Sequence, residues 1–268
     1  MPASGSKYSI LRFLHDPLIR GPFPVFSSKP RHPGVRALPC GPRSGSFSAM
    51  ATTGISRPTR ILSAVVGIVG VLLIGTSFGI NNGPSASATA SELAAFGAAH
   101  SGAIMVGAWL QAVGPVLIIF FAFALVHQAG LAGKLSGWMT LFGAVVLMMV
   151  SLTECVFYVA ALFPLPESQA LIATDIAHAV QHFYFIVAAP ALFLPLGIVV
   201  ITSGVLPRVL GWLAVVLAAA FAVLGITSLH SLVLSAATTS LAAVQALWWL
   251  AAAIALMARK PRAAEGQQ

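Results

Sequence analysis

Six long runs of apolar residues dominate the chain after residue 60. They lie at about 61–80, 102–126, 137–162, 178–202, 209–229 and 237–257. At a rise of about 1.5 Å per residue, each run forms a helix long enough to cross the roughly 30 Å hydrocarbon core of a bilayer. The runs lack the strict alternation of a membrane β-strand. The pattern therefore predicts an all-α fold, a polytopic transmembrane helical bundle of six spans.

Composition narrows the class of protein further. The chain has 268 residues, of which 58% are hydrophobic and only 7% are charged, and its mean hydropathy is +0.95. An ordinary soluble domain has roughly 25% charged residues. So few charges cannot cover a soluble surface, which excludes a soluble enzyme, a nucleic-acid-binding protein and a disordered chain. The expected partner is the lipid bilayer, and a homo-oligomer or a further protein partner is left open.

The net charge of +8 comes from the two ends of the chain. Within the helical region, Lys and Arg occupy alternate connections, whereas the acids Glu92, Glu167 and Asp175 occupy the others. The basic residues are Arg57 and Arg60 before the first span, Lys134, Arg208, and Arg259, Lys260 and Arg262 after the last span. Basic connections stay in the cytoplasm. We therefore expect a cell (inner) membrane protein with both termini in the cytoplasm.

The first 49 residues are rich in Pro, Gly, Ser and Arg and carry no hydrophobic period. Three interpretations of 1–49 remain open: an over-extended start, with the native start at Met50, a disordered basic tail, or an organellar transit peptide. The rest divides into a cytoplasmic segment at 50–60, a six-span membrane domain at 61–257 and a basic cytoplasmic tail at 258–268.

The first span competes with a cleavable signal peptide. Ala86-Ser87-Ala88 follows the apolar run and resembles a cleavage site. The run has about 20 residues, whereas a signal peptide has an apolar core of about 7–15. We therefore expect this segment to be retained as a span.

Ionisable residues inside spans are the best pointers to function, because their burial in hydrocarbon is costly. Asp175, His178 and His182 have the spacing i, i+3, i+7, which places them on one face of a helix. Ser151, Glu154 and Tyr158 have the same spacing on the third span. Glu154 lies roughly 13 Å from the outer end of its span. These residues predict a polar cavity open to the outer side.

One interpretation of the cavity is a divalent metal site such as zinc. His178 and His182 have helical metal-ligand spacing, and Glu154 completes a set of two histidines and one carboxylate. If the site is catalytic, the metal activates a water molecule for hydrolysis of a lipid-like substrate. Asp175 then acts as a base or hydrogen-bonds to a metal ligand. The helix sequence His-Ala-Val-Gln-His lacks the glutamate of a zincin, and neither Cys40 nor Cys155 belongs to a pair with metal spacing.

Other interpretations of the same residues stay open. The runner-up is a proton- or ion-coupled carrier of a small solute, in which Glu154 and His182 take up and release protons. A third is a non-catalytic membrane subunit, whose polar residues are hydrogen-bonded between helices. A b-type haem bound between His182 and either His100 or His230 is a further option, although these histidines are expected at different depths in the membrane.

Proline, glycine and aromatic residues are interpreted as packing features. Gly114-Pro115 interrupts the second span, and Pro190 and Pro195 interrupt the fourth. The sequence also contains Gly75-x-x-x-Gly79 and Gly133-x-x-x-Gly137, which permit close helix approach. Trp138 and Trp212 are expected at the cytoplasmic interface. No functional role is assigned to Phe183, Tyr184 or Phe185.

The end of the fourth span reads Ser203-Gly204-Val205-Leu206-Pro207-Arg208-Val209-Leu210-Gly211-Trp212-Leu213. This turn, small-Gly-x-Leu-Pro-Arg-x-Leu-Gly, resembles one found in uncharacterised bacterial six-span integral membrane proteins. The resemblance covers the span layout from about 57 to 257. It implies a bacterial inner membrane and brings no activity, substrate or catalytic residue.

Overall fold

The computed structural model describes residues 56–81, 83–84, 88–163, 166–228 and 236–259. The terminal segments expected at 1–49 and 50–60, the signal-peptide boundary at 86–88, His230 and the tail after 259 lie wholly or largely outside these residues. The described residues contain helices and no β-strand. The helices are α1 (Arg57–Ile80), α2 (Ala90–Gln128), α3 (Leu135–Leu162), α4 (Glu167–Phe183), the π-helix η3 (Tyr184–Ala188), α5 (Ala189–Ser203), α6 (Arg208–Thr227) and α7 (Ala236–Ala258).

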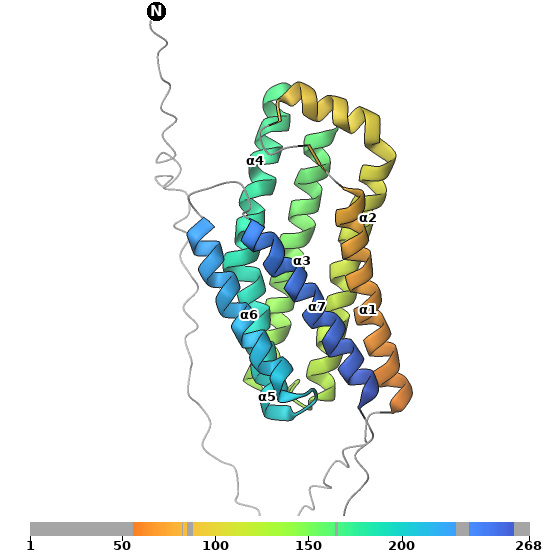
Figure 1. Cartoon of the computed structure of the whole chain (residues 1–268), viewed down its shortest axis with the longest axis vertical. Coiled ribbons are helices and arrows are strands. Elements are labelled where there is room, and N and C mark those ends of the chain that lie inside the picture. The colour runs from red at the N-terminus through yellow and green to blue at the C-terminus, as the bar shows by residue number, and fades with distance from the viewer. Residues whose placement is uncertain (1–55, 82, 85–87, 164–165, 229–235, 260–268) are drawn as a thin grey trace, which may run out of the picture. The chain divides into compact units, whose positions relative to one another are not determined.

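The expected all-α bundle is confirmed. Six helical segments in the described residues are long and apolar enough to cross a membrane, with α4, η3 and α5 together forming one of them. Neighbours in sequence pack side by side, and α7 returns to pack against α1 (Figure 1). Large apolar side chains such as Phe142, which is 69% exposed, cover the outside. A soluble protein does not expose so much apolar surface, whereas a bilayer covers it. The protein is a multi-pass membrane protein.

The order of the helices gives the bundle two chemically different ends. The end where α1 begins and α7 ends carries the described Lys and Arg residues, and we call it the basic end. At the opposite end α2 begins near Glu92 and α4 carries Asp175, and we call it the acidic end. The even number of spans places the first and last helix ends at the same end, as expected. Which side of the membrane each end faces stays a prediction.

Two helices begin about eleven residues earlier than hydropathy predicts. Both α2 and α4 have polar first turns that an apolar run does not register. In α2, a capping box explains the start: the Thr89 backbone N–H donates to Glu92 Oε2 over 2.7 Å, and the Glu92 N–H donates to Thr89 Oγ1 over 3.4 Å. The backbone then leaves helical angles at His100. The segment before His100 lies across the acidic end (Figure 1).

Glycines bring the helices together, but of the two spacings that the sequence suggests only Gly137 is closely packed, against the Leu131 carbonyl and the Val126 side chain. Neither Gly75 nor Gly133 has a neighbour where a Cβ would project. The close approach of α1 and α2 is reciprocal: a Cβ on Gly70 would lie 2.9 Å from the Gly114 carbonyl oxygen, and one on Gly114 would lie 3.1 Å from that of Gly70. Gly197 of α5 and Gly211 of α6 form a second such pair.

We expect Gly70→Leu to destabilise the bundle and Gly75→Leu to leave its stability nearly unchanged. A leucine side chain at position 70 would be forced against the backbone of α2, and such overpacking costs about 1–3 kcal/mol. Gly75 lies on the same helix and faces open space. Thermal unfolding in a mild detergent compares the two variants. Equal losses of stability would show that α1 does not pack on α2 at Gly70.

Candidate functional site

A carboxylate lies inside the bundle between α3 and α4. Glu154 is eight residues before the end of α3, which places it about 12 Å from that end along the helix axis. Gln181 of α4 donates a hydrogen bond from Nε2 to Glu154 Oε1 over 2.8 Å. Glu154 is thus held by a neutral amide rather than by a cation.

The described cations lie far from Glu154. Lys134 directly precedes α3, and Glu154 is twenty residues further along, which corresponds to about 30 Å of helix. Arg57, Arg60, Arg208 and Arg259 lie at the same basic end as Lys134. Ionisable residues inside membrane spans are rare, and they are candidates for functional residues by default.

His182 is buried, with 7% of its surface exposed, and its ring contacts Ser228, the residue that follows α6. Its Nδ1 lies 3.3 Å from the Ser228 hydroxyl oxygen, and the Ser228 hydroxyl is also 2.9 Å from the Gly225 carbonyl oxygen. A hydroxyl has one hydrogen, and a carbonyl oxygen can only accept. Ser228 therefore donates to Gly225, and His182 Nδ1 donates to Ser228. In the neutral ring, Nε2 is then left as the acceptor.

Tyr184 extends the polar contacts to α7. It is the first residue of the π-helix η3, and its hydroxyl donates to Gln245 Oε1 over 2.6 Å. The sequence interpretation of Tyr184 as a packing residue was therefore incomplete. Together, side chains from α3, α4, η3, α6 and α7 form what we call the polar cluster: Glu154, Gln181, His182, Tyr184, Ser228 and Gln245.

The metal-ligand set predicted from sequence is not brought together. Within the described part of the chain, no three His, Cys, Asp or Glu side chains are placed so that they could hold a metal ion. Gln181 and His182 are 100° apart around α4, so one contacts α3 while the other contacts α6. His178 is half-buried and Asp175 is exposed. Zinc binding by Glu154, His178 and His182, with Asp175 as a base, stays a prediction without support from this geometry.

The haem interpretation also finds no support. His100 is exposed at the kink of α2, where its ring stacks on Phe96 with centroids 4.4 Å apart. His182 is directed instead at Ser228 of α6. His230 lies outside the described residues.

An aromatic layer lies next to the polar cluster on the side of the basic end. The Tyr184 ring meets Phe221 edge to face, and Phe221 stacks on both Phe185 and Phe193. Phe193 in turn contacts Trp248 and Trp249 of α7. These rings belong to, or pack against, the larger of the two buried apolar clusters in the described residues. The polar cluster is therefore separated from the basic end by a packed apolar layer.

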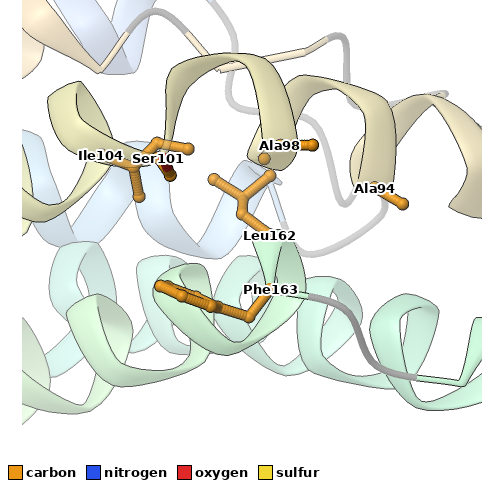
Figure 2. Close-up of a pocket in the computed structure, with 7 residues that line it drawn as sticks. Ala94, Ala98, Ser101, Ile104, Leu162 and Phe163 are labelled. Atoms are coloured by element: carbon orange, nitrogen blue, oxygen red, sulfur yellow. The ribbon is translucent and has the colours of Figure 1, made fainter.

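A small cavity of about 220 Å³ opens elsewhere at the acidic end. Figure 2 shows its lining: Ala94, Ala98, Ser101 and Ile104 from α2 face Leu162 and Phe163 at the end of α3. Gly97 packs directly on the Leu162 carbonyl there. None of the polar-cluster residues lines this cavity, and its walls are nearly all apolar, so it offers little to orient a ligand.

Sequence reasoning missed three members of the polar cluster. The sequence pattern presents Gln181 only as the fourth residue of a metal-like motif, and it gives Ser228 no role. The signal that could have found Gln181 is its spacing, because it follows His178 by three residues and shares its helix face. Ser228 and Tyr184 carry no such signal, because their hydrogen-bond partners are distant in sequence. Ser228 is 46 residues from His182, and Tyr184 is 61 residues from Gln245.

Comparison with known proteins gives no relative to reason from. No family model, curated protein or solved structure matches this chain.

Proposed function

We propose that the protein is a proton- or cation-coupled carrier of a small solute, with Glu154 as the coupling group. The observation that carries this proposal is the Glu154 carboxylate, which lies within a span, hydrogen-bonds to Gln181 and has every described Lys and Arg at the far end of the bundle. Such a carboxylate is stable when it carries a proton or a metal cation. The charged carboxylate with neither bound has a high free energy inside a span. Loading and unloading of Glu154 then changes the free energy of the surrounding packing.

The helix that carries Gln181, His182 and Tyr184 supports this proposal. Its α-helical hydrogen bonding gives way to the π-helix η3 shortly after Gln181 and His182, with Tyr184 as the first residue of η3, and Pro190 follows. Single-turn π-helices are frequent at functional sites, and a proline removes a further backbone hydrogen bond. The polar cluster therefore adjoins a segment in which regular α-helical hydrogen bonding is interrupted.

The aromatic layer supports an alternating-access cycle. The packed rings around Phe193 and Phe221 close the polar cluster toward the basic end. A carrier needs one side closed while the other is open. In this proposal the structure corresponds to the state in which Glu154 exchanges with the acidic side, and bending near η3 opens the basic side.

The orientation follows from the charge pattern. We propose that the basic end, with both termini, faces the cytoplasm of a bacterium and that the protein resides in the inner membrane. The positive-inside rule and the turn at Ser203–Leu213 support this assignment. The acidic end then faces the outside, where the external proton or cation binds.

Gradient-driven uptake tests the function without a named solute. Proteoliposomes under an inward proton or sodium gradient are exposed to a ¹³C-labelled cell metabolite extract, and mass spectrometry identifies what accumulates in the lumen. We expect at least one labelled solute to accumulate against its concentration, and an ionophore to abolish the accumulation. The proposal fails if neither gradient drives any solute into the lumen beyond the level of protein-free liposomes.

A further inference from the structure

The amide of Gln181 meets the Glu154 carboxyl group in the orientation that suits its charged form. Gln181 Nε2 donates to Glu154 Oε1 over 2.8 Å, between α4 and α3. A carboxylate only accepts hydrogen bonds, whereas a protonated carboxyl group also donates one. The uptake of a proton by Glu154 therefore adds an O–H donor that needs an acceptor inside the span.

A side-chain amide can hydrogen-bond to both forms of a carboxyl group. Its nitrogen donates and its oxygen accepts, and a half-turn about the last side-chain bond exchanges their positions. With Nε2 toward Glu154, Gln181 stabilises the carboxylate. With Oε1 toward Glu154, the same residue accepts the hydrogen of the protonated carboxyl group. Neither a cationic nor an apolar residue at position 181 could serve both forms.

A metal cation needs more ligands than the described surroundings of Glu154 supply. Calcium and magnesium ions are held by about six to eight oxygen ligands. In the polar cluster, the Ser228 hydroxyl oxygen accepts from His182, and Gln245 Oε1 accepts from the Tyr184 hydroxyl. Over the described ranges, no three His, Cys, Asp or Glu side chains could hold a metal ion. A proton needs only one carboxylate oxygen, which Glu154 provides.

Other titratable groups lie on the helices packed around α3. They are Cys155 and Tyr158 on α3 itself, Asp175, His178 and His182 on α4, Tyr184 on η3, and Glu92, His100 and His127 on α2, whereas α5 has none. Cys155, His182 and Tyr184 hydrogen-bond to groups other than Glu154. Gln181 is thus the side chain whose hydrogen bond can follow the protonation state of Glu154.

We propose that the coupling ion is the proton and that Gln181 is the positioning residue that responds when Glu154 binds it. A proton from the acidic side binds Glu154 Oε1, the amide of Gln181 makes a half-turn, and its oxygen accepts the new O–H. Gln181 is three residues before the start of η3, so this change occurs beside the interrupted part of the helix. The inference rests on the proposed function and deepens it, because it selects the proton over a metal cation.

Isotope-edited infrared difference spectroscopy tests the half-turn of the amide. The full chain in lipid bilayers is labelled with glutamine that carries ¹³C at the side-chain carbonyl, which separates the glutamine amide band from the other carbonyl bands. We expect a change of pH to produce a glutamine difference band together with the carboxyl band of Glu154. Addition of sodium, calcium or magnesium ions at constant pH is expected to produce neither band.

Gln181→Met and Gln128→Met form a matched pair of variants. Both remove an amide that hydrogen-bonds to another helix, but Gln128 Nε2 donates to Ser63 Oγ over 3.2 Å, at the last residue of α2. We expect Gln181→Met to lose the glutamine band and to keep the carboxyl band, and Gln128→Met to keep both. Gln181→Asn carries no label and keeps an amide, so it gives the same readout if Gln181→Met does not fold.

The possible results separate this inference from the proposed function. A glutamine band that persists in Gln181→Met would come from another residue and would overturn the role of Gln181. A carboxyl band that follows pH without a glutamine band would also overturn it, while Glu154 remained the coupling group. A carboxyl band that responds to a metal cation at constant pH would overturn the choice of the proton. The absence of any reversible carboxyl band would remove the proposed function itself, and this inference with it.

Discussion

Glu154→Gln protein is expected to exchange solute across the membrane but not to accumulate it against a gradient. Glutamine keeps the size of glutamate and one oxygen that can accept the hydrogen bond from Gln181. It cannot carry a proton or the charge that holds a cation. Exchange of labelled for unlabelled solute needs only the solute-loaded carrier to reorient, whereas accumulation needs the coupling group to be loaded and unloaded. The expected accumulation is that of protein-free liposomes.

Glu92→Gln is the matched control for this loss. Glu92 is exposed at the acidic end and closes the capping box of α2, and glutamine fulfils the same role at that position. We therefore expect Glu92→Gln to accumulate solute like the wild type. Accumulation by Glu154→Gln at the wild-type level would remove Glu154 from the coupling step, and equal losses in both variants would show an effect of charge alone.

Gln181→Leu is expected to give the largest loss of stability among changes in the polar cluster. Leucine cannot donate to Glu154 Oε1, which leaves a carboxyl group without its 2.8 Å partner inside a span. Loss of a hydrogen bond to a charged or buried group costs about 2 kcal/mol. We expect the melting temperature in detergent to fall clearly below that of the wild type.

The double variant Glu154→Leu, Gln181→Leu distinguishes a lost contact from a packing defect. Replacement of both partners by apolar groups of similar size is often neutral or stabilising, because no polar group is left unpaired. We therefore expect the double variant to recover most of the stability that Gln181→Leu loses, which is a large coupling energy in a double-mutant cycle. Additive losses would mean that the two side chains do not interact.

The layout of the spans could be read from the sequence because lipid imposes a simple rule. A helix in hydrocarbon must be apolar over about 20 residues, so the six expected runs coincide with the six membrane-long helical segments of the described structure. The starts of α2 and α4 were missed because helices that project beyond the bilayer need no apolar surface. The Thr89–Glu92 capping box was the available signal for α2.

The candidate site was only partly predictable, because spacing gives a helix face but not the neighbour that the face meets. Glu154 and His182 were correctly singled out as polar residues inside spans. Their assignment to one metal site required α4 to turn His182 toward α3, whereas the structure turns Gln181 that way. The contacts Tyr184–Gln245 and His182–Ser228 depend on the packing of α6 and α7, which the sequence does not specify locally.

The proposed function requires Glu154 to take up and release a proton or a cation inside the membrane. Infrared difference spectroscopy of the protein in lipid bilayers measures this directly, because a protonated carboxyl has a C=O stretching band that the carboxylate lacks. We expect this band to appear and disappear reversibly as the pH or the sodium concentration is changed, and to be absent from Glu154→Gln while it persists in Glu92→Gln. Identical difference spectra for the wild type and Glu154→Gln would exclude Glu154 as the coupling group.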